Sequence, residues 1–517
     1  MDAAFVRTYV HHSARPRASG DPGAERAVLA KDGVPARAGT NGGRRRTRKP
    51  YALAALLLML LPDPANAAAL DGSKLSWPWA LPFVGLLLTI AAGPLLFPRL
   101  WRRHYGKFTF VWGTLTLAPM AALFDGPTAL AALAHAALGE YLSFIVLLFV
   151  LYVVAGGILL TGNLRGTPLV NTAILAFGTL IASLVGTTGA AMILARPLIR
   201  ANAARLNNAH VVVFFIILVA NVGGALSPLG DPPLFAGFLH GVDFFWTTRH
   251  LLLPTALVAG LVLLAFVALD LRHFRKDRLV TTVGETVPPL ELRVRGTINV
   301  ALIAAIIGVI LAAAWWRPGV VFDVYGTKLE LQDLLRNAAL LLIAFLSLVL
   351  TPGEHREAND FTWDPIVEVA ILFAGIFACV IPVLAMLQAG KDGALGWLLA
   401  ALTARDGSPN DVAYFWLTGG LSAFLDNAPT YLVFFELTGG DAAKLMGPLA
   451  GTLAAISMGA VYMGALTYVG NAPNLMVYAI AVERGVKMPN FFGYLAWATI
   501  VLAPILALVT FVFVGRP

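Results

Sequence analysis

Gly224-Ala-Leu-Ser-Pro-Leu-Gly-Asp-Pro-Pro233 and Gly464-Ala-Leu-Thr-Tyr-Val-Gly-Asn-Ala-Pro473 are two ten-residue stretches that nearly superimpose at an offset of 240 positions. Each stretch interrupts an apolar run. Glycine and proline in the middle of a membrane helix leave backbone groups without hydrogen-bond partners, and lipid cannot supply such partners. A break of this kind is therefore tolerated where it lines a protein cavity or binds something polar. The pair therefore predicts two broken membrane helices, and a matched pair in two halves of a chain is typical of a transporter's binding site.

The composition favours a multi-pass membrane protein. Hydrophobic residues make up 58% of the 517 residues, charged residues only 13%, and the mean hydropathy is +0.77, whereas a soluble chain carries about 25% charged residues. The net charge of +8 comes largely from the first 49 residues and from short loops, so a nucleic-acid partner has little support. Cys379 is the only cysteine, which excludes an internal disulfide and a thiolate metal cluster, and no cofactor is expected.

The amino terminus reads as a leader. Residues 1–43 lack an apolar period and are rich in Ala, Arg, Gly and Pro, which predicts either disorder or a start codon assigned too far upstream. A basic cluster, the apolar stretch Tyr51–Leu61 and Ala65-Asn-Ala67 then match a secretory signal peptide with an A-x-A cleavage site. Residues 1–67 are therefore expected to be a disordered basic leader plus signal peptide, with a short uncleaved anchor as the alternative. Cleavage would place the mature start in a bacterial periplasm.

The remaining chain divides into two repeats around a polar linker. Two long apolar runs carry a polar kink, at Gly186-Thr-Thr-Gly189 and at Asp426-Asn-Ala-Pro429, and each is predicted to be a re-entrant hairpin whose limbs enter and leave on one side. The kink precedes the break by 44 residues in one half and 45 in the other. The expected units are a first repeat at 68–270 with hairpin 167–199 and broken helix 208–240, a cytoplasmic linker at 271–296, and a second repeat at 297–517 with hairpin 411–437 and broken helix 442–482.

Loop charge predicts the orientation of the repeats. The bases expected to follow the first span or to flank the first hairpin are Arg99, Arg102, Arg103, Lys107, Arg165, Arg196, Arg200 and Arg205, and later come the linker bases, Arg484 and Lys487. With the hairpins treated as non-crossing, all fall on one side, which the positive-inside rule makes cytoplasmic. An odd number of crossings between the two breaks then gives inverted topology. The expected fold is all-α and polytopic, in a bacterial inner membrane.

Polar residues at the kinks and breaks are the candidate binding site. Neutral oxygens come from Thr187, Thr188, Asn221, Ser227, Asn427, Thr430, Thr467, Asn471 and Asn474, and oxygen is what a hard cation such as sodium accepts in place of water. Asp426 and Asp231 lie in apolar surroundings, where an ionised acid is a functional candidate by default. We predict Asp426 as a shared proton and cation site, with Asn427 beside it as a ligand of transported sodium, and the others as completing the coordination.

Structural alternatives stay open for these residues. Asp426 is a good helix cap at a hairpin tip, Asp231 before two prolines could end a helix, and the Thr187–Thr188 pair could bond to preceding carbonyls. Other polar residues are expected at interfaces or in loops because they begin or end apolar spans or lack metal-ligand spacing; these are Glu140, Glu368, Glu436, His210, His240 and His250.

Several of these motifs resemble the ion transporter superfamily, most closely the NhaD-type sodium/proton antiporters and the citrate transporter branch. The resemblance rests on the tip Phe424-Leu-Asp-Asn-Ala-Pro-Thr430, the break Gly470-Asn-Ala-Pro-Asn474 and the span from Glu368 that ends in Leu372-Phe-Ala-Gly-Ile-Phe377. It covers roughly residues 80–515. It implies a homodimer with a scaffold and a mobile transport domain that works by an elevator-like motion, exchanging sodium or lithium for protons.

The alternatives differ in substrate and in class. Carboxylate symporters of this superfamily typically carry Ser-Asn-Thr at both tips, and this chain does not, so sodium- or proton-coupled transport of citrate, a dicarboxylate or an oxyanion is the second reading. An intramembrane aspartyl protease would need a Gly-x-Gly-Asp motif, and Pro228-Leu-Gly-Asp231 lacks the first glycine, so no enzyme is expected. A channel is the remaining alternative, and stoichiometric proton movement would distinguish it from an exchanger.

Overall fold

The computed structural model describes residues 70–278 and 292–514. The leader and signal peptide expected over 1–67 lie outside the described residues, as does much of the linker expected over 271–296. Within the described ranges, nine helices are long and apolar enough to cross a membrane, and the strands there form two short two-stranded sheets. The expectation of an all-α polytopic membrane protein is confirmed.

The elements that precede the first hairpin are η2 (Gly72–Lys74), η3 (Trp77–Ala80), α3 (Leu81–Leu96), α4 (Pro98–Leu123), α5 (Gly126–Ala134), the π-helix η4 (His135–Tyr141), α6 (Leu142–Gly156) and β1 (Leu159–Gly162). Between the two repeated units lie β2 (Leu292–Arg295), α12 (Ile298–Trp315), β3 (Val321–Val324), β4 (Thr327–Glu330), α13 (Leu331–Leu350), α14 (Gly353–Ala358), α15 (Asp364–Gln388), η6 (Gly390–Asp392) and α16 (Gly396–Ala401).

Two helical hairpins and two broken helices lie within the described residues. The first unit contains hairpin 1, made of α7 (Pro168–Val185) and α8 (Thr187–Ala201), then broken helix 1, made of α9 (Ala209–Leu218), η5 (Val222–Leu226) and α10 (Pro232–Leu239), then α11 (Trp246–Arg278). The second contains hairpin 2, made of α17 (Asp411–Ser422) and α18 (Asn427–Leu437), then the short α19 (Ala442–Met446), broken helix 2, made of α20 (Ala450–Met463), η7 (Gly464–Leu466) and α21 (Ala472–Glu483), and α22 (Phe491–Phe513). The order of elements repeats, and their inverted orientation stays a prediction.

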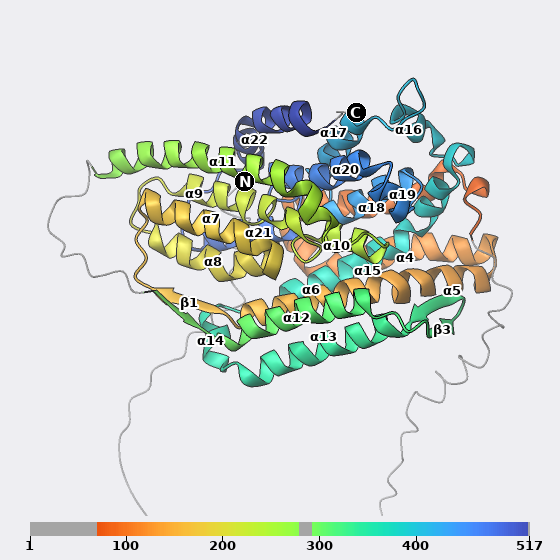
Figure 1. Ribbon diagram of the computed structural model, residues 1–517, viewed down its shortest axis with the longest axis horizontal. Coiled ribbons are helices and arrows are strands. Elements are labelled where there is room, and N and C mark those ends of the chain that lie inside the picture. The colour runs from red at the N-terminus through yellow and green to blue at the C-terminus, as the bar shows by residue number, and fades with distance from the viewer. Residues whose placement is uncertain (1–69, 279–291, 515–517) are drawn as a thin grey trace, which may run out of the picture.

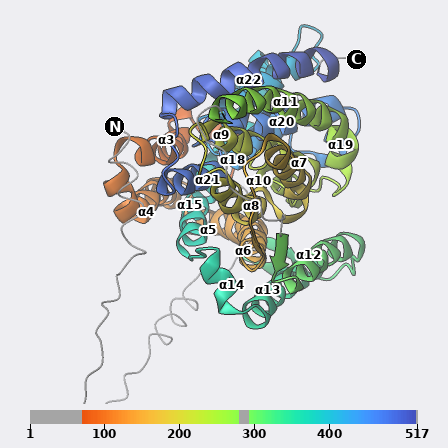
Figure 2. The ribbon, with the colours of Figure 1, turned by 90° about the vertical axis from the view of Figure 1, so that its left-hand side faces the viewer.

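The interrupted helices lie inside a frame of continuous ones. In Figure 1, α12 and α13 run along one long edge and α11 and α22 along the opposite edge, and Figure 2 shows the same separation from the side. In the apolar windows of Trp77–Leu96 and Phe491–Phe513 only 22% of residues are buried inside the protein, against 89% for Ala209–Leu226. The outer helices therefore offer their apolar surface to lipid, and broken helix 1 is at the centre.

Glycines allow the chain to turn tightly at the breaks. Gly186 has φ 80° between α7 and α8, a conformation that glycine adopts without strain. A Cβ atom at Gly230 would lie 2.1 Å from the carbonyl oxygen of Gly224, and one at Gly470 would lie 2.7 Å from that of Gly464. Each sequence stretch contains such a pair of glycines. In both, the pair lets two backbone segments of the break approach each other more closely than a side chain would allow.

At the centre of the protein, a half-helix of each unit packs against the hairpin of the other unit. Half-helix α10 of the first unit packs against α18 of hairpin 2, and half-helix α21 of the second unit packs against α8 of hairpin 1. This reciprocal packing is what a two-fold relation between the units would give. It brings both hairpin tips and both breaks to one place.

Some boundaries differ from the expected ones. The linker predicted at 271–296 begins as helix, because α11 continues to Arg278, and it ends in β2, which pairs antiparallel with β1 through Leu159 and Arg295. The bases Arg99, Arg102, Arg103 and Lys107, expected to follow the first span, lie within α4, which begins at Pro98. Hydropathy marks where a helix leaves lipid and not where its backbone hydrogen bonds end, so helices extend into the polar flanks.

Candidate functional site

Two matching hydrogen bonds fix each broken helix to the hairpin that precedes it. Ser227 Oγ donates to the carbonyl oxygen of Ser183 in α7. Thr467 Oγ1 donates to the carbonyl oxygen of Ala423 at 2.6 Å, next to α17. Both hydroxyls are buried, and both bonds join residues 44 positions apart. These two predicted site residues therefore position the breaks.

Asp231 is the residue at which all four interrupted segments meet. Its side chain is 1% exposed. Oδ1 accepts a hydrogen bond from Thr187 Oγ1 at 3.2 Å and from Asn471 Nδ2 at 3.0 Å, and Oδ2 accepts one from Asn427 Nδ2 at 2.6 Å. Thr187 begins the second limb of hairpin 1, Asn427 begins that of hairpin 2, and Asn471 lies in the other break. Both repeats therefore contribute donors to one carboxylate.

Three buried asparagines extend this network away from Asp231. Asn471 Nδ2 also lies 3.4 Å from Asn221 Oδ1, and Asn221 Nδ2 donates to Asn474 Oδ1 at 2.7 Å. Asn474 Nδ2 in turn donates to the carbonyl oxygens of Gly464 at 2.9 Å and Thr467 at 3.0 Å. The asparagines thus satisfy carbonyl groups that the broken helices leave free. We call the connected set the Asp231 cluster; its members are Thr187, Asn221, Asp231, Asn427, Asn471 and Asn474.

Four half-helices begin at this cluster. Thr187 and Asn427 are the first residues of α8 and α18, and Asp231 and Asn471 are the N-caps of α10 and α21. A helix amino end carries roughly half a positive charge. Their convergence lowers the cost of a negative charge at this point. The side chains that hydrogen-bond to Asp231 in the described residues are two amides and a hydroxyl, none of them cationic.

Asn427 has a buried side-chain acceptor that no hydrogen bond uses in the described residues. Its Nδ2 donates to Asp231, and its Oδ1 is buried without a hydrogen-bond partner in the part of the chain that the structure describes. A buried acceptor left unpaired is costly. An oxygen ligand beside a carboxylate suits a hard cation, which would satisfy this atom and Asp231 together. This oxygen is therefore a candidate ligand for a hard cation.

Asp426, predicted as the shared proton and cation site, lies at the border of the cluster. It is half-buried and caps α18, with Oδ1 accepting from the amide of Ala428 at 3.2 Å. Thr430 Oγ1 donates to the carbonyl oxygen of Asp426 at 2.9 Å, and Thr188 makes no side-chain hydrogen bond within the described residues. These three border the cluster without entering its hydrogen-bond network. The geometry gives the central position to Asp231.

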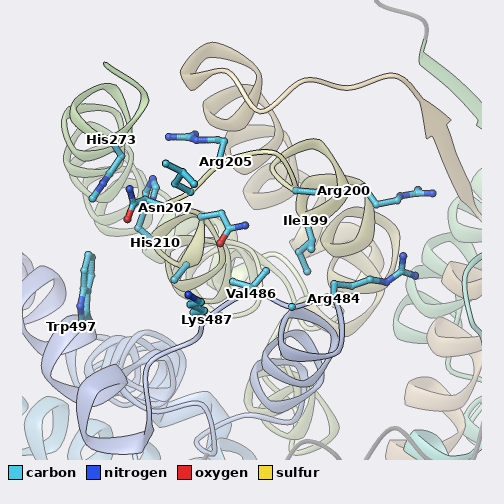
Figure 3. A pocket seen from close by; sticks show the side chains of 15 residues that line it. Ile199, Arg200, Arg205, Asn207, His210, His273, Arg484, Val486, Lys487 and Trp497 are labelled. Carbon is cyan, nitrogen blue, oxygen red and sulfur yellow. The ribbon is translucent and has the colours of Figure 1, made fainter. Parts of the chain in front are cut away.

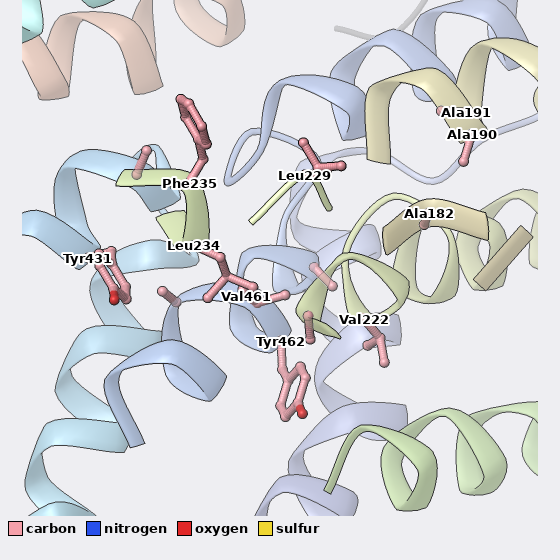
Figure 4. Packing of buried hydrophobic residues seen from close by; sticks show 14 of the residues in the cluster. Ala182, Ala190, Ala191, Val222, Leu229, Leu234, Phe235, Tyr431, Val461 and Tyr462 are labelled. Carbon is pink, nitrogen blue, oxygen red and sulfur yellow. The ribbon is translucent and has the colours of Figure 1, made fainter. Parts of the chain in front are cut away.

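An apolar shell surrounds the breaks. Figure 4 shows Leu234 and Phe235 of α10, Val222 of η5 and Tyr431 of α18 around them, and all four are almost fully buried. In such surroundings an ionised carboxylate without a partner charge is expensive. Asp231 therefore favours a bound proton or a bound cation over an empty site.

Two serines of the hairpins were not predicted from the sequence. Ser183 Oγ donates to the carbonyl oxygen of Gly223 at 2.6 Å and accepts from the amide of Leu226 at 3.0 Å. Ser422 Oγ donates to the carbonyl oxygen of Ala460 at 2.6 Å. Both lie near the end of the first limb of a hairpin, three or four residues before its kink, and that shared spacing is the signal that could have identified them.

A separate basic cavity of about 540 Å³ lies away from the cluster, at the end of α8 and the start of α9 (Figure 3). Arg200, Arg205, Arg484 and Lys487 line it together with His210 and His273. Bases from the first hairpin and from the loop before α22 therefore gather in one place, as the orientation argument expects. We call it the basic cavity.

Several polar residues are more buried than predicted. His210, expected in a loop or at an interface, is 4% exposed and lies 2.8 Å from Asp270, which also pairs with Arg205 at 2.5 Å. Glu436, also expected at an interface, is 4% exposed, and Glu368 accepts a hydrogen bond from Trp101 Nε1 at 3.0 Å. Each of these side chains has a partner distant in sequence that neutralises it or forms a hydrogen bond with it. The hydropathy of one span does not reveal such a partner, so it could not predict the burial of the side chain.

Comparison with known proteins agrees with this architecture. The sequence matches none of the curated proteins. The family model described as "Putative citrate transport" matches residues 72–514, which is nearly the whole described chain. This multi-pass membrane protein therefore belongs to that citrate-transport family of the ion transporter superfamily, a family of secondary transporters.

Proposed function

We propose that this transporter exchanges sodium or lithium for protons, with Asp231 as the group that binds either one. The observation that carries the proposal is the fully buried Asp231 carboxylate held by donors from both repeats. A buried acid in a membrane protein is a functional candidate by default. Asp426, at the start of α18, is proposed to raise the local cation concentration through its negative charge.

Proton and cation compete for the same oxygens in this scheme. A cation bound between Asp231 and Asn427 Oδ1 would fill the unpaired acceptor, and protonation of Asp231 would remove the charge that holds the cation. Each occupant neutralises the buried carboxylate and thereby lowers the cost of moving it through an apolar region. Binding one therefore requires release of the other.

Transport of citrate or a related anion is the second candidate. The family description favours it, and so do the four helix amino ends that converge at the cluster, because such ends bind anions. In this reading the cation at Asp231 is the coupling ion and offsets repulsion between the carboxylate and a multivalent anion. Both candidates thus share the Asp231 site and differ in the second substrate.

Alternating access between inverted repeats completes the proposal. The reciprocal packing of α10 on α18 and of α21 on α8 supports a two-fold relation, and inverted repeats allow one site to face either side in turn. We propose an elevator-like motion of both hairpins and both broken helices against the framing helices, in a homodimer within a bacterial inner membrane.

The test is proton movement in proteoliposomes that contain a trapped pH-sensitive dye. Purified protein is challenged in turn with sodium, lithium, potassium and citrate. We expect sodium or lithium to drive proton movement, and Asp231→Asn to abolish it. The variant should fold, because an asparagine already occupies the matching position 471 of the second break. An exposed carboxylate outside the site, Glu354, gives the matched control Glu354→Gln.

Each outcome has a distinct meaning. If citrate changes the dye signal and labelled citrate is taken up, while sodium alone moves no protons, the protein is an anion symporter and not a cation/proton exchanger. Response of Asp231→Asn equal to the native protein would refute the assignment of Asp231.

A further inference from the structure

A second group of titratable side chains lies at the far ends of the same two half-helices. Nε2 of His240, the C-cap of α10, is 3.8 Å from Oε1 of Glu140 in η4 and 4.0 Å from Oε1 of Glu436 in α18. The three side chains are 18%, 16% and 5% exposed. Gln388 Nε2 of α15 donates to Glu436 Oε2 at 3.1 Å. We call Glu140, His240 and Glu436 the outer triad.

The hydrogen bond on the other side of the ring determines the tautomer of His240. Nδ1 lies 2.9 Å from the carbonyl oxygen of Ala236, and a carbonyl oxygen only accepts, so Nδ1 carries its hydrogen. Nε2 is then the atom that gains or loses a proton, and it faces both carboxylates. Without a proton among them, the Nε2 lone pair and two anionic oxygens would repel one another in partly dry surroundings. A proton bound at Nε2 or at one of the carboxylates would relieve this repulsion, so the triad is a place where a proton can bind.

The two half-helices connect the outer triad to the Asp231 cluster. Asp231 and His240 are the two caps of α10, and Asn427 and Glu436 lie on α18, in each case nine residues apart. At 1.5 Å per residue this separation is about 13 Å. The helices pack against each other, and the Tyr431 hydroxyl is so close to α10 that a Cβ at Gly237 would lie 2.3 Å from it. One packed pair of helices thus has a buried polar cluster that contains Asp231 at one end and the outer triad at the other.

The outer triad lies on the opposite side of Asp231 from the basic cavity. The cavity includes the start of α9, whereas the triad is at the end of α10, and the break separates these half-helices. In Figure 1, α9 lies to the left of the centre, and α10 and α18 lie to the right. If the basic cavity is cytoplasmic, as loop charge predicts, the triad is near the periplasmic face.

The groups that face the triad support a proton site and no metal site. His135, also in η4, acts electrostatically on Glu140 together with His240 and Glu436, and the contact from α15 is the neutral Gln388. No combination of His, Cys, Asp and Glu in the described residues has the arrangement to hold a metal ion. Glu140 lies in a π-helix, a feature that frequently occurs at functional sites.

We propose that the outer triad binds the proton in transit between Asp231 and the membrane face opposite the basic cavity. The inference rests on the proposed cation/proton exchange. A proton taken from water on that face bonds to His240 Nε2 or to a carboxylate oxygen of the triad. When the transport cycle opens the cluster to this face, that bond breaks, water carries the proton to the cluster, and an O–H bond forms at Asp231 as the cation leaves.

The experiment separates proton coupling from cation movement. His240→Gln, Glu436→Gln and Glu140→Gln are reconstituted singly, and each is measured for sodium-driven proton movement and for exchange of labelled sodium against unlabelled sodium. We expect proton-coupled exchange to fall about tenfold or more, as for loss of a positioned acid or base. Sodium-for-sodium exchange, which needs no net proton transfer, should persist. Glu436→Asp should retain coupling.

Asp392→Asn is the matched control, because Asp392 is an exposed carboxylate that closely follows Gln388 of α15. Retention of proton-coupled exchange in all three variants would overturn the relay and leave the proposed function standing. Equal loss of sodium-for-sodium exchange would show a purely structural role for the triad and would also overturn it. Absence of cation-driven proton movement in the native protein would overturn both proposals together.

Discussion

Asp231 and Asn471 occupy equivalent places in the two repeated stretches, yet one is an acid and the other an amide. Each is the N-cap of a half-helix, and Asn471 Nδ2 donates to Asp231 Oδ1 at 3.0 Å. Two carboxylates at this distance would repel each other and could not both be ionised. Because position 471 carries an amide, it can donate a hydrogen bond to the single carboxylate at the equivalent position of the other repeat. One acid between two repeats is the asymmetry that the proposed exchange of a proton for a cation at Asp231 requires.

One substitution distinguishes the proposed role of Asp426 from that of Asp231. Asp426→Asn keeps a good helix cap for α18, because asparagine caps as well as aspartate, and removes only the charge. We expect transport to continue with a raised sodium KM, while the maximal rate changes little. Initial rates of labelled sodium uptake over a range of sodium concentrations test this. Complete loss of uptake would instead give Asp426 the central role.

Asn427 supplies both a donor to Asp231 and the unpaired buried oxygen. Asn427→Ala removes both, and loss of a contact to a charged group costs about 1.5–3 kcal/mol, or about 10- to 100-fold in affinity. We expect the sodium Kd of the purified protein to rise by that factor, as measured by isothermal titration. An unchanged Kd would exclude Asn427 Oδ1 as a ligand.

At the residue level the sequence shows which polar residues interrupt the apolar runs, but not which of them contact one another. The polar residues at kinks and breaks were identified because glycine, proline and polar side chains are conspicuous in apolar runs. Which acid is central depends on contacts such as Asn427 to Asp231, which spans 196 positions, and Asn471 to Asp231, which spans 240. No local pattern carries that information, so the sequence could not show that Asp231, and not Asp426, is the acid to which Asn427 and Asn471 donate.

At the level of elements, the breaks are built by backbone folding back on itself. Gly230→Ala would place a Cβ 2.1 Å from the Gly224 carbonyl oxygen, and that oxygen belongs to the backbone, which cannot move aside as a flexible side chain could. We expect this variant to unfold at a clearly lower temperature and to lose transport. Gly308→Ala in α12 is the matched control, because a Cβ there meets nothing within 4 Å and alanine favours a helix over glycine by about 1 kcal/mol. Thermal unfolding in detergent compares the two, and equal melting temperatures would contradict the account.

The interrupted elements were predictable and the ends of the continuous ones were not. Gly186, the Pro232–Pro233 pair and Pro473 mark three helix boundaries directly, because each residue has a backbone preference that ends or begins a helix. The extension of α11 to Arg278 has no such marker. The pairing of β1 with β2 joins segments far apart in sequence, so local patterns could not show it.

At the scale of the whole molecule, the two repeats are interlocked through each other's hairpins. The account predicts that hairpin 1 opens to the cytoplasm and hairpin 2 to the periplasm. Cys379 is the only cysteine and is buried, so a Cys379→Ala background allows single cysteines to be placed at exposed Arg200 and Ser408, next to the open ends of the two hairpins. A membrane-impermeant maleimide should label Arg200→Cys in everted vesicles and Ser408→Cys in intact cells. Labelling of both from one side would contradict inverted topology.

The repeat itself was visible in the sequence, since two matched stretches at one offset predicted two units and one site. The reciprocal packing that joins them was not, because α10 with α18 and α21 with α8 are contacts between units. The outer triad likewise draws Glu140, His240 and Glu436 from three elements. Each of these residues alone resembles an ordinary interfacial side chain.

The most direct test of the central claim is proton release on cation binding. Purified protein in a weakly buffered detergent solution receives sodium chloride, with potassium chloride as the ionic-strength control, and the pH change is recorded. The account predicts that sodium releases protons from the native protein and that Asp231→Asn releases few or none. Sodium binding without proton release, or equal release by native protein and Asp231→Asn, would contradict it.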